Sequence, residues 1–141
     1  MSPKICLDAG VLDIHFSKNC TQKVQKLMDS ILREDLQAYI LRPILIESYY
    51  HLCKLKGNEI AQITITSFLN KYPINLVNIS NDLIYSAGKL KCQNRTTLSY
   101  NDCLSIAFCL NKRVEFHTTE KNLENVSNTT LQRLKIEKYR F

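Results

Sequence analysis

The sequence lacks the features expected of membrane, secreted and zinc-binding proteins. No apolar run approaches the roughly 18 residues of a membrane-spanning helix, and the first residues, MSPKICLDAG, enter a strand pattern without an apolar signal region. The six cysteines form no CxxC pair, and neither they nor the three histidines have the spacing of a zinc site. No pattern pairs a histidine with a serine or cysteine nucleophile, and there is no repeat or linker. We therefore expect a cytoplasmic protein without a membrane segment, folded as one domain over residues 1–141.

The chain has enough apolar residues for a core and an excess of positive charge. Hydrophobic residues make up 45% and charged residues 23% of its 141 residues. The net charge of +6 and the pI near 9.0 favour an anionic partner such as nucleic acid, anionic lipid or an acidic protein. One basic group precedes the segment that begins at Ser99, and another lies at the C-terminus: Lys89, Lys91 and Arg95, then Arg133, Lys135, Lys138 and Arg140. Each group could contact phosphates or form an ordinary solvated face, and both interpretations stay open.

Strand patterns alternate with helix patterns along the chain. Short apolar or alternating runs predict strands at 4–7, 36–41, 75–79 and 114–118, with a last edge strand at 131–136. Apolar residues at helical spacing predict helices after Asp8 and over 21–33, 43–56, 59–71, 81–90 and 99–110, with a short helical piece after Glu120. Strands that alternate with helices indicate a parallel sheet covered on both faces. We therefore expect an α/β fold, a three-layer α/β/α sandwich around four or five strands.

Two acidic residues are expected at one edge of this sheet. Asp8 ends the first strand, and Glu120 comes just after the strand at 114–118. In a parallel sheet the ligand crevice lies beyond the carboxyl ends of the strands. Each residue also has an ordinary interpretation, Asp8 as the N-cap of the next helix and Glu120 as a solvated acid that opens a helix over 121–124.

Two further acidic residues lie near the starts of helices. Asp102 falls in the first turn of an almost wholly apolar helix capped by Ser99, where the helix dipole favours a carboxylate. Glu47 stands among apolar residues in the helix that begins at Pro43, where a carboxylate is costly to bury without a cation. A capping box and an ion pair, respectively, are the ordinary interpretations. Because helix starts follow strand ends in this fold class, we expect all four acids to converge on one edge.

Convergent carboxylates indicate a site for divalent metal ions. Two carboxylates about 5 Å apart repel by roughly 3 kcal/mol at an effective dielectric constant of about 20, so four in one cleft require cations or shifted pKa values. Oxygen ligands alone favour Mg²⁺ or Mn²⁺ over zinc. Such ions activate water and stabilise charge on a phosphodiester during in-line attack. A basic surface around an acidic metal pocket therefore predicts a metal-dependent nuclease.

The order of these acids and the residues around them resemble the PIN-domain ribonucleases, particularly the small VapC-type toxins of toxin–antitoxin pairs. The resemblance covers essentially the whole chain and is carried by ICLDAGVL around Asp8, LIESYYHL around Glu47, LSYNDCLSIAFCL around Asp102 and VEFHTTEKNL around Glu120. It implies a parallel-sheet α/β/α sandwich and a Mg²⁺- or Mn²⁺-dependent endoribonuclease that hydrolyses RNA. It also implies frequent homodimers and inhibition by a cognate antitoxin whose helix or tail blocks the cleft.

Carried over residue by residue, the resemblance implies a set of site residues. Asp8, Glu47 and Asp102 match the most typical metal-site acids, and Glu120 occupies the fourth position. Asp8, Asp102 and Glu120 would bind the metal as catalytic residues, while Glu47 would hold the metal or its water. Thr118 matches the Thr that precedes the fourth acid by two residues. Substrate contacts would come from Thr118 and from three basic residues, Lys89, Lys91 and Arg95.

Two departures from the family pattern leave alternatives open. Gly10 stands where a Ser or Thr hydroxyl commonly follows the first Asp, and the longer Glu120 replaces the more usual Asp and could shift a second metal. A PIN-like module that has lost catalysis and only binds RNA or a protein is therefore a second hypothesis. A phospho-acceptor signalling domain is a third, but that class has two adjacent acids after an early strand and a lysine after a late one. Asp8 stands alone, and no lysine follows Phe116 before Lys121.

Overall fold

The protein is built around a five-stranded parallel sheet. We describe it from a computed structural model that covers residues 2–121, 123 and 126–141. The strands are β1 (Lys4–Leu7), β2 (Gln37–Leu41), β3 (Ile74–Val77), β4 (Glu115–Thr118) and β5 (Ile136–Lys138), in the spatial order β3-β2-β1-β4-β5. All four pairs of neighbouring strands are parallel. The chain order reverses beside β1, which is where open α/β sheets form a crevice at their carboxyl edge.

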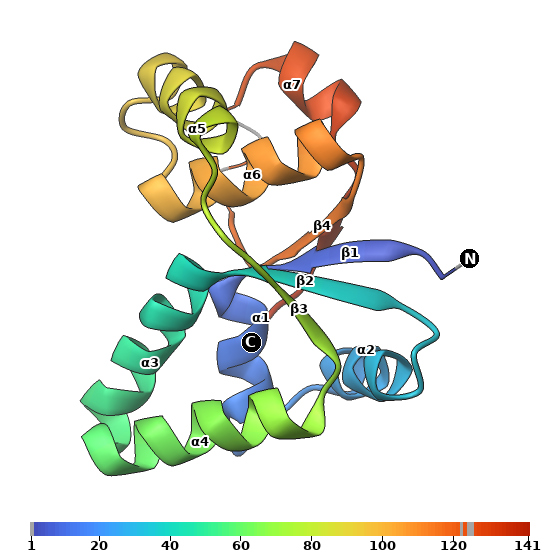
Figure 1. Cartoon of the computed structure of the whole chain (residues 1–141), viewed down its shortest axis with the longest axis vertical. Helices are drawn as coiled ribbons and strands as arrows, with labels where there is room; N and C mark the ends of the chain where they lie inside the picture. The colour runs from blue at the N-terminus through green and yellow to red at the C-terminus, as the bar shows by residue number, and fades with distance from the viewer. Residues whose placement is uncertain (1, 122, 124–125) are drawn as a thin grey trace.

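Helices cover both faces of the sheet, as the alternating pattern predicted. On one side lie α1 (Ala9–Phe16), α2 (Gln22–Leu32), α3 (Arg42–Lys56) and α4 (Asn58–Lys71); on the other lie α5 (Asn81–Gln93), α6 (Tyr100–Lys112) and α7 (Asn128–Arg133) (Figure 1). Because β1 is covered on both faces, Ile5, Cys6 and Leu7 are all buried. The predicted three-layer α/β/α sandwich is confirmed, and no helix of the described residues is long and apolar enough to cross a membrane.

The two helices that carry predicted site acids begin close to the sheet edge. α3 follows β2 without an intervening loop, has Pro43 in its first turn and ends at Gly57, whose φ of 87° suits glycine. α6 begins after the N-cap Ser99 and ends at Arg113, which adopts a left-handed conformation. Most of α6 is buried between α5 and the sheet, which explains why its sequence is apolar nearly all round. Its first turn is therefore held by packing as well as by its cap.

The position of the last strand was wrong. We predicted a strand at 131–136, but α7 extends through Arg133 and β5 begins at Ile136. The hydroxyl of Ser127 accepts a hydrogen bond from the Thr130 N–H (3.4 Å), a side-chain cap that starts a helix there. The other predicted strands agree with the observed ones to within two residues. The helical piece that we predicted over 121–124 lies partly outside the described residues.

Candidate active site

Asp8 lies at the carboxyl edge of the sheet, directly after β1. Its N–H continues the strand ladder by donating to the carbonyl oxygen of His117 (3.0 Å). Its Oδ1 accepts a hydrogen bond from the N–H of Ala9 (2.8 Å), so the N-cap interpretation is correct. Its Oδ2 accepts a second bond from the hydroxyl of Thr118 (2.8 Å). Asp8 is only 6% exposed, and its carboxylate is thus fixed at the carboxyl end of the central strand β1.

Thr118 links this carboxylate to the segment that carries Glu120. Its hydroxyl donates to Asp8 and accepts a hydrogen bond from the Glu120 N–H (3.0 Å). The side chain is fully buried. This burial suits a residue that positions the two acids better than the direct RNA contact that we predicted for it.

Asp102 and Ser99 form the capping box that was its ordinary interpretation. The Asp102 N–H donates to the Ser99 hydroxyl (3.1 Å), and the Ser99 N–H donates to Oδ2 of Asp102 (3.1 Å). The pKa of Asp102 is raised to about 6, mainly by burial and also by the charge and a shared hydrogen bond of Glu120, against the lowering effect of the bonds from Ser99. Capping therefore does not remove Asp102 from the acidic group, because its carboxyl group also faces Glu120.

Glu47 has a neutral partner, and not the ion pair that was its ordinary interpretation. Its Oε1 accepts a hydrogen bond from the side-chain amide of Asn101 (2.7 Å), and no salt bridge to Glu47 is found among the described residues. The side chain is half-buried. Asn101 precedes Asp102 in α6, so this bond ties α3 to the start of α6. Sequence reasoning missed Asn101, and its position beside Asp102 was the one available signal.

The carboxylate of Asp8 experiences the charge of two other predicted acids. Its pKa is raised to about 7, mainly by burial, then by the negative charge of Asp102 and to a smaller extent by that of Glu47. The hydrogen bonds from Thr118 and Ala9 act in the opposite direction. Together with the contact between Asp102 and Glu120, these effects show that each of the four predicted acids lies close enough to another one to influence its charge.

The donor chemistry of this edge fits a hard divalent cation. All four acids offer oxygen, and the like charges that raise the pKa values of Asp8 and Asp102 would be relieved by a bound cation. Within the described residues, no three His, Cys, Asp or Glu side chains already stand at the mutual spacing of a preformed metal site. A cation would therefore have to draw the acids closer together than they stand in this structure.

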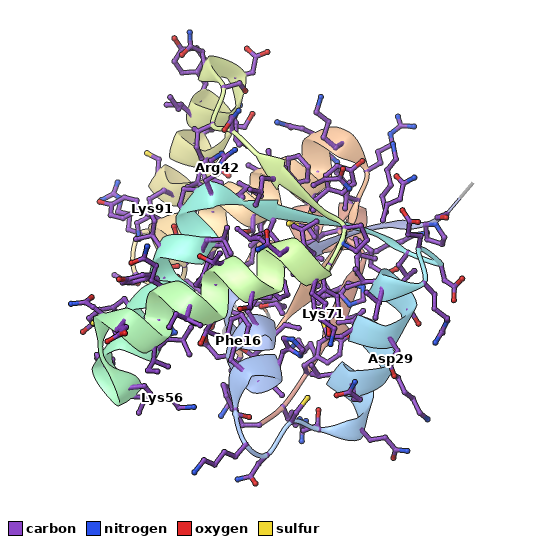
Figure 2. All side chains as sticks on the ribbon, turned by 60° about the horizontal axis from the view of Figure 1, so that its bottom comes forward. Phe16, Asp29, Arg42, Lys56, Lys71 and Lys91 are labelled. Carbon is purple, nitrogen blue, oxygen red and sulfur yellow. The ribbon has the colours of Figure 1, made fainter. Side chains whose placement is uncertain are left out.

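The predicted basic residues lie in different environments. Lys91, near the end of α5 (Figure 2), donates from Nζ to the carbonyl oxygens of Arg95 (2.8 Å) and Leu98 (2.5 Å). It therefore holds the loop that leads to α6. Lys89 is exposed and lines a cavity of about 580 Å³ beside the half of α6 remote from Asp102. The side chain of Arg95 is exposed.

Sequence reasoning also missed Arg42, a cation at the same sheet edge. Arg42 is the first residue of α3 and directly follows β2 (Figure 2). Its Nε donates to Oδ1 of Asn78 (2.6 Å), a neutral partner, and no salt bridge to Arg42 is found in the part of the chain that the structure describes. The adjacency of a strand end and an arginine could have identified it. Arg42 is thus exposed on the edge to which β2 contributes its carboxyl end.

Solved structures with the same fold come from bacterial toxin–antitoxin systems. The chain is similar to one in the VapBC2 complex from Rickettsia felis bound to a DNA fragment from the promoter, with 16% identity, a TM-score of 0.75 and coverage of 97% of this chain and 99% of that one. The DNA-bound VapBC of Salmonella typhimurium gives 14% identity, a TM-score of 0.70 and 98% coverage of both chains. Mycobacterium tuberculosis VapC20, a toxin that cleaves the sarcin-ricin loop, gives 15% identity and a TM-score of 0.63 over 79% of this chain and 85% of that one. At these identities the likeness establishes the fold.

The sequence itself identifies the family. A comparison with curated proteins gives no match. The family model for the PIN domain, however, matches residues 5–128, a span that runs from β1 into the start of α7 and includes Asp8, Glu47, Asp102 and Glu120. The fold of the VapC toxins and this family match agree, and the chain belongs to the PIN domain family.

Proposed function

We propose that this protein is a Mg²⁺- or Mn²⁺-dependent endoribonuclease that hydrolyses phosphodiester bonds of RNA. The observation that carries the proposal is the meeting of acids from four segments, the ends of β1 and β4 and the helices α3 and α6. A bound cation would relieve the repulsion between these carboxylates, as expected for a metal-binding site in its metal-free form. Membership of a family of nucleases gives the reaction class.

Each acid has a separate task in this proposal. A cation held by Asp8, Asp102 and Glu120 would supply charge stabilisation at the phosphodiester and acidify the attacking water. Thr118 fixes the orientation of Asp8 and the backbone of Glu120 through its two hydrogen bonds. Asn101 orients Glu47, whose half-buried carboxylate is available to accept a proton from the attacking water.

Basic side chains around the acidic edge would bind the RNA backbone. Arg42 and Arg95 are both exposed and carry the charge that a phosphate requires. Lys91 supports Arg95 indirectly by holding the loop that contains it. Lys89 would contact RNA only where the strand extends toward the far half of α6.

We also propose that the protein is a cytoplasmic toxin, a homodimer neutralised by a cognate antitoxin. One similar chain comes from a toxin–antitoxin complex of Klebsiella pneumoniae and others come from VapBC complexes, which supports the proposal. Exposed apolar side chains on α3 and α4 support a protein partner, because Ile46, Tyr50, Leu55 and Ile63 are each more than half exposed. Co-expression with any small reading frame found next to the gene would test the antitoxin, and light scattering would test the dimer.

RNA cleavage by the purified protein tests the enzymatic proposal. Cleavage with Mn²⁺ should stop with EDTA and after Asp102→Asn. Asp29→Asn is the matched control, since Asp29 lies on α2, on the far side of the sheet from α6 (Figures 1 and 2). Cleavage that persists in EDTA and in Asp102→Asn would reject a metal-dependent mechanism.

A binding module without catalysis is the second candidate function. It is favoured by the absence, within the described residues, of three acids at metal-binding spacing. RNA binding without Mn²⁺-dependent cleavage would support this candidate over the nuclease.

A further inference from the structure

The side chain of Thr119 packs against Gly10 at the acidic edge. Gly10 is the second residue of α1, and a Cβ atom added to it would lie 1.8 Å from Oγ1 of Thr119, 2.9 Å from its Cβ and 3.0 Å from its Cγ2. These distances are far below van der Waals contact. The side chain of Thr119 therefore fills the volume that any other residue at position 10 would need.

The backbone does not explain the glycine. Gly57 is the glycine with positive φ among the described residues, whereas Gly10 lies inside a regular helix. A glycine within a helix costs about 0.5–1 kcal/mol relative to alanine, because the unfolded chain has more freedom. The contact with Thr119 explains why glycine is present despite this loss of stability, since only glycine leaves room for the Thr119 hydroxyl.

The location of the hydroxyl relates it to the proposed active site. Thr119 lies between Thr118, which donates to Asp8, and Glu120. Gly10 is two residues after Asp8 and in the same first turn of α1. Thr118 is fully buried, whereas Thr119 and Gly10 are both partly exposed. Of the two threonines, Thr119 is thus the partly exposed one at this edge.

We propose that Thr119 is a positioning residue of this site: its hydroxyl, in the space left by Gly10, binds the hydration shell of the divalent cation held beside Asp8. This inference rests on the proposed function. Mg²⁺ and Mn²⁺ retain several waters when few protein groups bind them, and a fixed hydroxyl orients such waters by hydrogen bonding. In this arrangement Thr119 supplies the hydroxyl oxygen, and Gly10, which has no side chain, leaves the space that the hydroxyl fills.

Mn²⁺ affinity, measured by isothermal titration calorimetry, tests the hydroxyl separately from its volume. Thr119→Val keeps the shape and removes the hydroxyl, so the affinity should fall about 3- to 10-fold, the loss of one hydrogen bond. Thr119→Ser keeps the hydroxyl and should bind within about twofold of the wild type. Gly10→Ser combined with Thr119→Gly returns a hydroxyl from the other side, and this double variant should bind Mn²⁺ more tightly than Gly10→Ala combined with Thr119→Gly.

A double-mutant cycle on stability tests the shared space without metal. Gly10→Ala should lower the unfolding midpoint strongly in the wild-type background, because its new Cβ meets Thr119. The same change should be neutral or stabilising in the Thr119→Gly background. Equal effects in the two backgrounds contradict the steric half of the inference.

The two levels of the proposal fail differently. If the wild type binds Mn²⁺ and Thr119→Val binds it equally well, the role of the hydroxyl is refuted while the nuclease proposal stands. If the wild type binds no Mn²⁺, the metal site and this inference both fall.

Discussion

Two groups of acidic side chains in this protein have opposite surroundings. Beside β4 and β5, Glu137 lies 2.5 Å from Nζ of Lys23, and Glu115 lies 2.9 Å from Nε2 of His117. At the carboxyl edge of the sheet, Asp8 bonds to a hydroxyl and a backbone N–H, and Glu47 bonds to an amide. The first group has partners that carry or can carry positive charge, and the second has neutral partners and other acids.

The pKa values of Glu137, Asp8 and Asp102 are shifted in directions that follow the same division. The hydrogen bond from Lys23 holds the pKa of Glu137 below its ordinary value. Burial and like charge raise the pKa values of Asp8 to about 7 and of Asp102 to about 6. An acid paired inside the protein stabilises structure, whereas buried acids that face one another need a cation from outside. The second group is therefore the one that we propose as the active site, and four experiments test its difference from the first group.

The largest expected effect is on catalysis. Asp8→Asn should reduce Mn²⁺-dependent RNA cleavage by about 100-fold or more, because it removes a charged oxygen ligand. Glu137→Gln, the same chemical change in the paired group, should leave the cleavage rate near that of the wild type. Single-turnover cleavage of a fluorescent RNA measures both. Equal losses in the two variants would erase the distinction between the groups.

The second effect concerns metal-free stability and pH. Because the pKa values of Asp8 and Asp102 are raised in the folded state, the folded protein binds more protons than the unfolded chain between about pH 4 and pH 7. These two groups therefore make stability fall as pH rises through this range. Asp8→Asn should flatten the profile and stabilise the metal-free protein by about 2 kcal/mol at pH 8. Urea unfolding in EDTA at pH 5 and pH 8 measures it, and a variant less stable than the wild type at pH 8 contradicts the cause assigned here.

The third effect concerns RNA binding at the same edge. Arg42→Gln should weaken binding by about 3- to 5-fold at physiological salt and reduce the dependence of affinity on salt, since one phosphate contact is lost. Lys56→Gln, at the opposite end of α3 (Figure 2), is the control. Fluorescence anisotropy with the Asp8→Asn protein avoids cleavage during the measurement. A salt dependence unchanged by Arg42→Gln would place the RNA elsewhere.

The smallest effect should come from the paired group itself. The side chains of Lys23 and Glu137 are about half exposed, at 52% and 43%. Exposed pairs of this kind contribute about 0–1 kcal/mol, so Glu137→Gln should change the free energy of unfolding by less than about 0.5 kcal/mol. Chemical denaturation at pH 7 checks this value. A loss above about 2 kcal/mol would show that the pair is essential to the β4–β5 region.

Local signals in the sequence were sufficient for most of the fold. The strand at 4–7, the cap at Ser99 and the helix stop at Gly57 depend on neighbouring residues, so they could be predicted. Parallel topology then placed the end of β1 and the end of β4 at one edge. The last strand was misplaced because Ser127 starts a helix in a segment whose apolar residues also fit a strand.

The contacts within the candidate site could be predicted less completely. The sequence identified Asp8 and Asp102 as edge residues, because strand ends and helix caps have recognisable patterns. It did not identify the bond between Glu47 and Asn101, since 54 residues separate them and side-chain directions depend on packing. The overlap of Gly10 with Thr119 was hidden for the same reason. The sequence marked the glycine as unusual, and the fold supplied the neighbour that explains it.

The capping box at the start of α6 links the backbone of the first helical turn to the Asp102 carboxylate. One carboxylate oxygen of Asp102 accepts a hydrogen bond from the Ser99 N–H, so the strength of this bond depends on the other groups that the carboxylate contacts. Hydrogen exchange at the amides of Ser99 and Asp102 would thus report occupancy of the acidic edge in a protein that carries no tryptophan to serve as an optical probe.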